Sequence, residues 1–218
     1  MNFLSHAVPY LDRPLVAAAT GVPDWLSIVD RKIRARSRLA APFVQSDDLQ
    51  LRDVAVGIIR DHEDDRWFHG TEAFVSTNLE LAVQLRDQLP GDAGFRPTFV
   101  GHILIEMLLD SLTIRDQPDL AERYYFSISE AGAENIQRCV NQITGKPTDR
   151  LAAVIERFVK IAFLYDYRDV ERLLFRLNQV MNRVGLEPLP QSLLGWLPEA
   201  EKLVESRRDA LLALPDPS

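Results

Sequence analysis

The chain has 218 residues, 46% of them hydrophobic and 26% charged, which is the composition of an ordinary globular protein with a sizeable core. Its net charge of -7 argues against nucleic acid as the main partner, because phosphate binding requires a basic surface. The single cysteine, Cys139, excludes an internal disulfide and a cysteine-rich zinc site. We therefore expect one domain over residues 1–218, in a reducing compartment.

The beginning of the chain does not read as a secretory signal. The opening "MNFLSHAVPYLDRP" lacks a basic segment, and His6, Pro9 and Asp12 interrupt its short apolar run. No stretch reaches the eighteen or so uncharged apolar residues that a membrane span requires. These features predict a cytoplasmic protein without membrane contact.

Apolar residues recur at three- and four-residue spacing through most of the chain, which predicts helices. The expected helices cover residues 47–70, 71–89, 96–112, 118–144 with a break near Gly132, 149–167, 168–186 and about 198–214. Residues 90–94 and 145–149 read as loops, and 215–218 as a frayed tail. The fold class is therefore all-α: a single compact bundle of roughly seven to ten helices, given typical helix lengths.

Two features precede the first long helix. Asp24 follows Pro23 at the start of a predicted helix, where a carboxylate is favoured by the helix dipole. The segment "DRKIRARSR" then gathers basic residues in an otherwise acidic chain: Arg31, Lys32, Arg34, Arg36 and Arg38. This segment is either a solvated helix face or a docking patch for a phosphate or an acidic partner. Under the second interpretation, Arg31, Arg34 and Arg38 are candidate substrate-binding residues.

Histidines and carboxylates recur at helical spacing in residues 60–70. On a regular helix, Asp65 lies about 60° from His62, and His69 lies about 20° from His62, so all three project from one side. Ile58 lies on that side too, which indicates that it faces the interior. Imidazole nitrogens and carboxylate oxygens are ligands for divalent cations. The spacing therefore favours a metal site.

The predicted helix over 96–112 repeats this pattern inside an apolar sequence. His102, Glu106 and Asp110 are spaced by four and drift by about 40° per step along one stripe. Buried carboxylates without a counter-charge cost several kcal/mol, on the order of the desolvation penalty. Either a metal ion or buried arginines must offset them. Individually, these residues also fit structural roles: His69 as a cation near a helix end, and Glu106 as a partner of Arg96 or Arg115.

At these residues the sequence resembles the bacterial acyl carrier protein phosphodiesterase family. "MNFLSH" matches the family's opening Met-Asn-Phe-Leu-Ala-His string except at Ser5, and Asp24-Trp25 resembles its Gly-Asp-Phe step. The family's third motif is Gly-Ile followed by a histidine, then Ile-Asp, then Thr-Asp. Gly57-Ile58 and Asp65 match it in spacing, whereas His69 stands where the family has its second aspartate. The family's histidine after that glycine is replaced by Asp61, and its Asp-x-x-x-Asp-His motif by His102-x-x-x-Glu106. The resemblance covers about the first 110 to 130 residues.

The resemblance implies an all-helical fold, distantly similar to histidine–aspartate domain phosphohydrolases, with the metal site in residues 1–115 and the helices of 117–214 packed around it. It implies release of 4′-phosphopantetheine from a carrier serine with Mn²⁺, or with Mg²⁺, Fe or Zn²⁺. Together with the spacings, it makes His6, His62, Asp65, His69, His102 and Asp110 candidate metal ligands. Glu106 and Asp24 are the candidate catalytic residues.

Two other functions are compatible with the same residues. The chain can be a helical interaction or scaffold protein in which the polar cluster is held by internal salt bridges. It can also be a metal-dependent hydrolase of an unrelated small phosphoester. Acyl carrier protein is acidic, as this chain is, so long-range steering would be repulsive and docking would depend on the basic segment.

Overall fold

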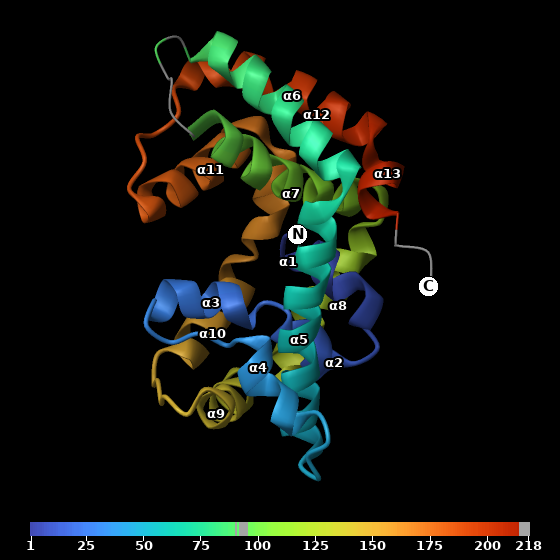
Figure 1. The fold of residues 1–218 in the computed structure, drawn as a ribbon, viewed down its shortest axis with the longest axis vertical. Helices are drawn as coiled ribbons and strands as arrows, with labels where there is room; N and C mark the ends of the chain where they lie inside the picture. The colour runs from blue at the N-terminus through green and yellow to red at the C-terminus, as the bar shows by residue number, and fades with distance from the viewer. Residues whose placement is uncertain (90, 92–95, 214–218) are drawn as a thin grey trace. The chain divides into compact units, whose positions relative to one another are not determined.

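The all-α fold class is confirmed: in a computed structural model that describes residues 1–89, 91 and 96–213, every regular element is helical (Figure 1). Most of the loop predicted at 90–94 and the tail at 215–218 lie outside the described residues. The described residues group into two compact units. Unit 1 comprises Met1, residues 3–66 and residues 117–163, and unit 2 comprises Asn2, residues 67–116 and residues 164–218. The helices predicted over 117–214 are thus divided between the units.

Unit 1 contains short helices from the beginning of the chain and three longer ones from its middle. Its elements are α1 (Phe3–Ala7), η1 (Val8–Tyr10), α2 (Pro14–Ala19), α3 (Val22–Val29), α4 (Ser37–Ala40), η2 (Ala41–Phe43), most of α5 (Leu49–Gly70), α8 (Pro118–Ala131), α9 (Ala133–Thr144) and α10 (Leu151–Ile161). Helix α10 lies beside α9 and α3 (Figure 1).

An aromatic cluster fixes α1 in unit 1. The ring of Phe3 lies 4.8 Å from that of Phe158 on α10 and 6.2 Å from that of Trp25 on α3. All three residues are buried, and Trp25 is fully enclosed. Aromatic rings contribute large buried areas and preferred packing geometries, so this cluster holds the first helix against two others. It thereby sets the position of the residues that follow Phe3 on α1.

Unit 2 is built around α7 (Arg96–Asp116), whose residues are buried on most sides. Its other elements are the last residues of α5, α6 (Glu72–Gln88), most of η3 (Phe163–Arg168), α11 (Val170–Val184), η4 (Gln191–Gly195), α12 (Leu197–Ser206) and α13 (Arg208–Leu212). Helix α7 packs against α6, α11 and α12. Among the described helices, α7 alone has the length and apolarity of a membrane span, but 78% of its most apolar stretch is buried inside the protein.

Local sequence signals place most helix ends where they were expected. Asp48 accepts backbone hydrogen bonds from Gln50 and Leu51, so it caps the start of α5. Thr71 caps α6 in the same way by accepting from the N–H of Phe74. Gly132 has a φ of +74° and separates α8 from α9, as the predicted break required.

Three predicted elements differ from the structure. The helix expected over 149–167 ends at Ile161, because Ala162 adopts the left-handed conformation with a φ of +50°. The helix expected over 198–214 is broken at Arg207 into α12 and α13. The basic segment over residues 30–36 is not a helix face, because its backbone is non-helical.

Candidate metal centres

One cluster of metal-binding side chains lies in unit 1, where α1 meets α5. His6 comes from α1, and Asp61, Asp64 and Asp65 come from α5. Residues three and four apart share a helix face, so these carboxylates project on one side of α5. Gly57, one turn earlier, lets α5 approach α2 closely: a Cβ atom there would lie 2.5 Å from the carbonyl oxygen of Val16. This close packing helps to place Asp61.

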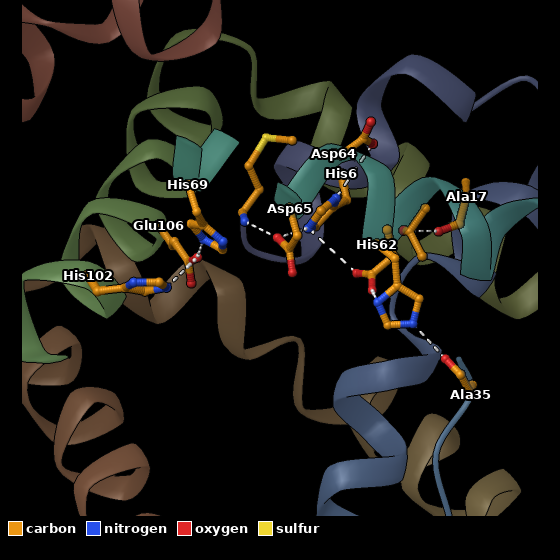
Figure 2. Close-up of polar contacts among 12 residues, drawn as sticks. His6, Ala17, Ala35, His62, Asp64, Asp65, His69, His102 and Glu106 are labelled. Atoms are coloured by element: carbon orange, nitrogen blue, oxygen red, sulfur yellow. Dashed lines mark hydrogen bonds and ion pairs between the residues drawn. The ribbon is translucent and has the colours of Figure 1, made fainter. Parts of the chain in front are cut away.

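The His6 imidazole lies among these carboxylates (Figure 2). Its Nε2 is 3.2 Å from Asp65 Oδ1 and 3.6 Å from Asp61 Oδ1, and its Nδ1 is 3.7 Å from Asp64 Oδ2. His6 is 3% exposed and Asp61 5%, whereas the Asp65 side chain is 38% exposed. The amino group of Met1 also contacts Asp65 Oδ1, at 2.5 Å. Ligand atoms of His6, Asp61 and Asp65 all lie within 4.8 Å of one another, so this set can hold a metal ion.

The pKa values in this cluster diverge strongly. Burial lowers the pKa of His6, but the Asp64 and Asp65 carboxylates outweigh burial and raise it to about 9. Burial raises the pKa of Asp61 to about 8, against the attraction of His6 and with a further increase from the charges of Asp65 and Asp24. Burial also raises the pKa of Asp65, but the His6 imidazole and the Met1 amino group together outweigh burial and lower this pKa to about 2. Strongly perturbed, interacting groups of this kind are typical of functional sites.

His62 lies next to this set but is directed elsewhere. Its Nε2 is 2.7 Å from the carbonyl oxygen of Ala35, and because a carbonyl only accepts, that nitrogen carries the proton (Figure 2). Its Nδ1 is 3.7 Å from Asp61 Oδ2. His62 therefore ties the basic segment to α5 beside Asp61, and it is not one of the three side chains whose ligand atoms converge.

Between a turn at residues 31–32 and α4, the basic segment is non-helical and its residues alternate in exposure. Ile33 and Ala35 are buried, whereas Arg31, Arg34, Arg36 and Arg38 are exposed. Asp24 is exposed in the first turn of α3, and its charge contributes to the raised pKa of Asp61. The candidate substrate-binding residues Arg31, Arg34 and Arg38 thus belong to the same unit as the His6 cluster.

A second cluster lies in unit 2, between the last turn of α5 and the middle of α7. His69 Nε2 is 2.8 Å from Glu106 Oε1, and His102 Nε2 is 3.3 Å from the same oxygen (Figure 2). The ligand atoms of these three side chains also lie within 4.8 Å of one another. Burial raises the pKa of Glu106, but the hydrogen bonds with His102 and His69 act against burial, and the pKa lies well below its usual value.

The predicted ligands are therefore distributed over two sets in two units. His6 and Asp65 belong to the first, and His69 and His102 to the second, where Glu106, predicted as a catalytic residue, is the third donor. Asp110, one turn beyond Glu106 on α7, is fully buried and belongs to neither set. Asp61 was missed as a ligand, although it precedes Asp65 by four residues and so shares its helix face.

Comparison with known proteins adds no relative to these findings: no protein-family model, no curated protein and no solved structure matches the chain.

Proposed function

We propose that the protein is a divalent-metal-dependent phosphohydrolase, most similar in chemistry to acyl carrier protein phosphodiesterase, with its metal held by His6, Asp61 and Asp65. The observation that carries this proposal is a buried imidazole whose two nitrogens lie within 3.2–3.7 Å of three carboxylates. In the metal-free protein, the His6 imidazolium and the Met1 amino group offset the charges of Asp64 and Asp65, and Asp61, whose pKa burial raises to about 8, holds a proton. A divalent cation would replace these protons at the converging ligand atoms and allow Asp61 to ionise.

The donor set favours a hard cation. One imidazole and two or three carboxylates provide mostly oxygen ligands, which suit Mn²⁺ and Mg²⁺ better than soft metals. Metal binding displaces the protons that His6 and Asp61 hold in the metal-free protein, so affinity increases with pH. A bound cation of this type polarises a phosphoryl oxygen and lowers the pKa of a coordinated water.

The remaining residues have roles that follow from their places in unit 1. Asp24 is exposed, and its charge acts on Asp61, so it is our candidate for orienting the attacking water and accepting its proton. Arg31, Arg34 and Arg38 are exposed on the segment that Ala35 anchors to α5 through His62. Guanidinium groups bind phosphate and carboxylate oxygens in a forked geometry. They suit both a phosphodiester and the acidic surface of a carrier protein.

The test is Mn²⁺-dependent hydrolysis by the full chain. The substrates are holo acyl carrier protein, with loss of phosphopantetheine followed by mass spectrometry, and the generic diester bis-p-nitrophenyl phosphate. We expect activity with Mn²⁺, none after chelation, and loss in Asp61→Asn. The control is Glu63→Gln, an exposed carboxylate on the same helix that pairs with Arg60. Cleavage of the generic diester alone would favour a small phosphoester as substrate, and no cleavage of either would refute the proposal.

A scaffold function is the second candidate, and one observation favours it. His6 retains its proton up to a pH of about 9, so the imidazolium can satisfy part of the carboxylate charge without any metal. In that case the cluster is a structural ion-pair network that holds α1 against α5. Elemental analysis of the purified protein and of its Asp61→Asn variant separates the two functions: stoichiometric metal that is lost in the variant supports the hydrolase. Absence of metal, with an unchanged melting temperature on adding Mn²⁺, supports the scaffold.

A further inference from the structure

We propose that His69, His102 and Glu106 form a further metal site in unit 2, selective for Zn²⁺ or a similar transition ion. The site shares no residue with the His6 cluster and does not depend on the proposed hydrolase function. Its donors are two imidazoles and one carboxylate, the set found in zinc sites that keep a position open for water.

The distances agree with coordination geometry. A tetrahedral zinc ion with bonds of about 2.1 Å has ligand atoms roughly 3.4 Å apart. The two Nε2 atoms lie 2.8 and 3.3 Å from Glu106 Oε1, and all three ligand atoms lie within 4.8 Å of one another. Small side-chain rotations therefore suffice to place an ion between them. Each imidazole that binds through Nε2 keeps its remaining proton on Nδ1.

Helix geometry and packing hold the three donors in place. His102 and Glu106 are four residues apart on α7, so they lie one above the other on the same face. Gly101 allows α7 to approach α6, since a Cβ atom there would lie 2.5 Å from Asn78 Oδ1. The site is thus built on rigid elements, which is what a metal-binding geometry needs.

Aromatic rings enclose one side of the site. The Phe74 ring lies 4.9 Å from the His69 ring and 5.0 Å from the His102 ring, and Phe68 lies 5.4 Å from His69. Such surroundings lower the local dielectric and strengthen the attraction between Glu106 and a cation. Glu106 is only 12% exposed, whereas the imidazoles are 29% and 34% exposed. An ion therefore has access from solvent while its carboxylate ligand is sheltered.

A shallow pocket borders the site. Its volume is about 260 Å³, and it is lined by Asn78, Thr98, Phe99 and His102. His102 is thus shared between the donor set and the pocket. Because three protein ligands leave a tetrahedral ion one position short, we assign that position to water or to a small anionic ligand.

The test is titration of the metal-free full chain with Zn²⁺ and Co²⁺ in the His6→Ala background, which removes the imidazole donor of the first cluster. We expect one equivalent of Zn²⁺ by calorimetry and visible d–d absorption when Co²⁺ is bound. Adding Glu106→Gln or His102→Ala should weaken binding at least about 100-fold, because a ligand is lost. Glu199→Gln, an exposed carboxylate on α12 in the same unit, is the matched control and should bind as the parent does.

Two readouts keep this proposal separate from the hydrolase. Zn²⁺ binding in the His6→Ala background, together with no phosphodiesterase activity in the unmodified chain, would support the further site and refute only the proposed function. No Zn²⁺ binding in the His6→Ala background, or equal binding with and without Glu106→Gln, would overturn the further site. Circular dichroism of each variant checks that the helices are retained, and Glu106→Gln preserves side-chain volume in case His102→Ala unfolds.

Discussion

Replacing Asp61 with asparagine should stabilise the metal-free protein while removing the proposed metal site. In the folded chain, burial raises the pKa of Asp61 to about 8, whereas its ordinary value is 3.8. At pH 7 this carboxylate therefore takes up a proton on folding. That uptake costs about 1.4 kcal/mol for each pH unit above the ordinary pKa, or about 4 kcal/mol as an upper bound. Asparagine carries no charge and avoids this cost.

The stabilisation by asparagine is smaller than this upper limit, because the asparagine amide brings its own buried hydrogen-bond donors. A buried donor without a partner costs about 1–3 kcal/mol, so we expect a net stabilisation of about 2 kcal/mol. For a chain of this size, that corresponds to an increase in melting temperature of roughly 4–8 °C. The assay is thermal unfolding of the chelator-treated protein at pH 7, followed by circular dichroism.

The matched variant, Asp65→Asn, should have the opposite sign. The pKa of Asp65 is lowered to about 2, because the His6 imidazole and the Met1 amino group both favour the ionised form against burial. Its neutralisation removes a favourable ion pair, so the metal-free protein should melt at a lower temperature than the parent. Both variants should lose Mn²⁺ binding. If Asp61→Asn destabilises the chelated protein as much as Asp65→Asn does, then burial does not raise the pKa of Asp61, and our description of the charges in this cluster is wrong.

Three further results are expected. The pKa of His6 is raised from 6.5 to about 9, so its contribution to stability is complete below pH 6.5 and is lost as the pH rises through 9. The melting temperature of the chelated protein should therefore fall between these pH values. A melting temperature that does not change over this range would contradict the prediction. Gly57→Ala should destabilise by about 1–2 kcal/mol in urea titrations despite its better helix propensity, because the new methyl group meets Val16 and Ala19; a more stable variant would show that α5 does not pack closely there. Ala162→Gly should stabilise by up to about 1 kcal/mol, since glycine adopts the left-handed conformation without strain, and a loss of stability in the same titration would refute this reading of the α10 end.

The helices could be predicted from the sequence because their signals are local. Caps such as Asp48 and Thr71 and the break at Gly132 act through backbone groups a few residues away. The early end of α10 at Ala162 has no such signal, because alanine favours helix and its left-handed conformation is not visible in its type. The non-helical backbone of residues 30–36 has no such signal either. Arginines are good helix formers, whereas the structure buries Ile33 and Ala35 between exposed arginines.

The candidate site could be predicted only in part. Spacing along one helix shows which side chains share a face, and it grouped His102 with Glu106 as the structure does. It does not show which partner comes from elsewhere in the chain. His62 shares a face with Asp65 by spacing, but its Nε2–H donates a hydrogen bond to the carbonyl oxygen of Ala35, 27 residues earlier in the chain. Asp61 was overlooked for the same reason, because its role depends on His6 in another helix.

The central claim is that His6, Asp61 and Asp65 bind a divalent cation. It is tested most directly by measuring Mn²⁺ bound to the chelator-treated, re-dialysed chain and to its His6→Ala variant by electron paramagnetic resonance. We expect a bound-Mn²⁺ signal of one equivalent in the parent that is absent from His6→Ala, with helical content unchanged. Equal Mn²⁺ binding by both proteins, or none by either, would contradict it.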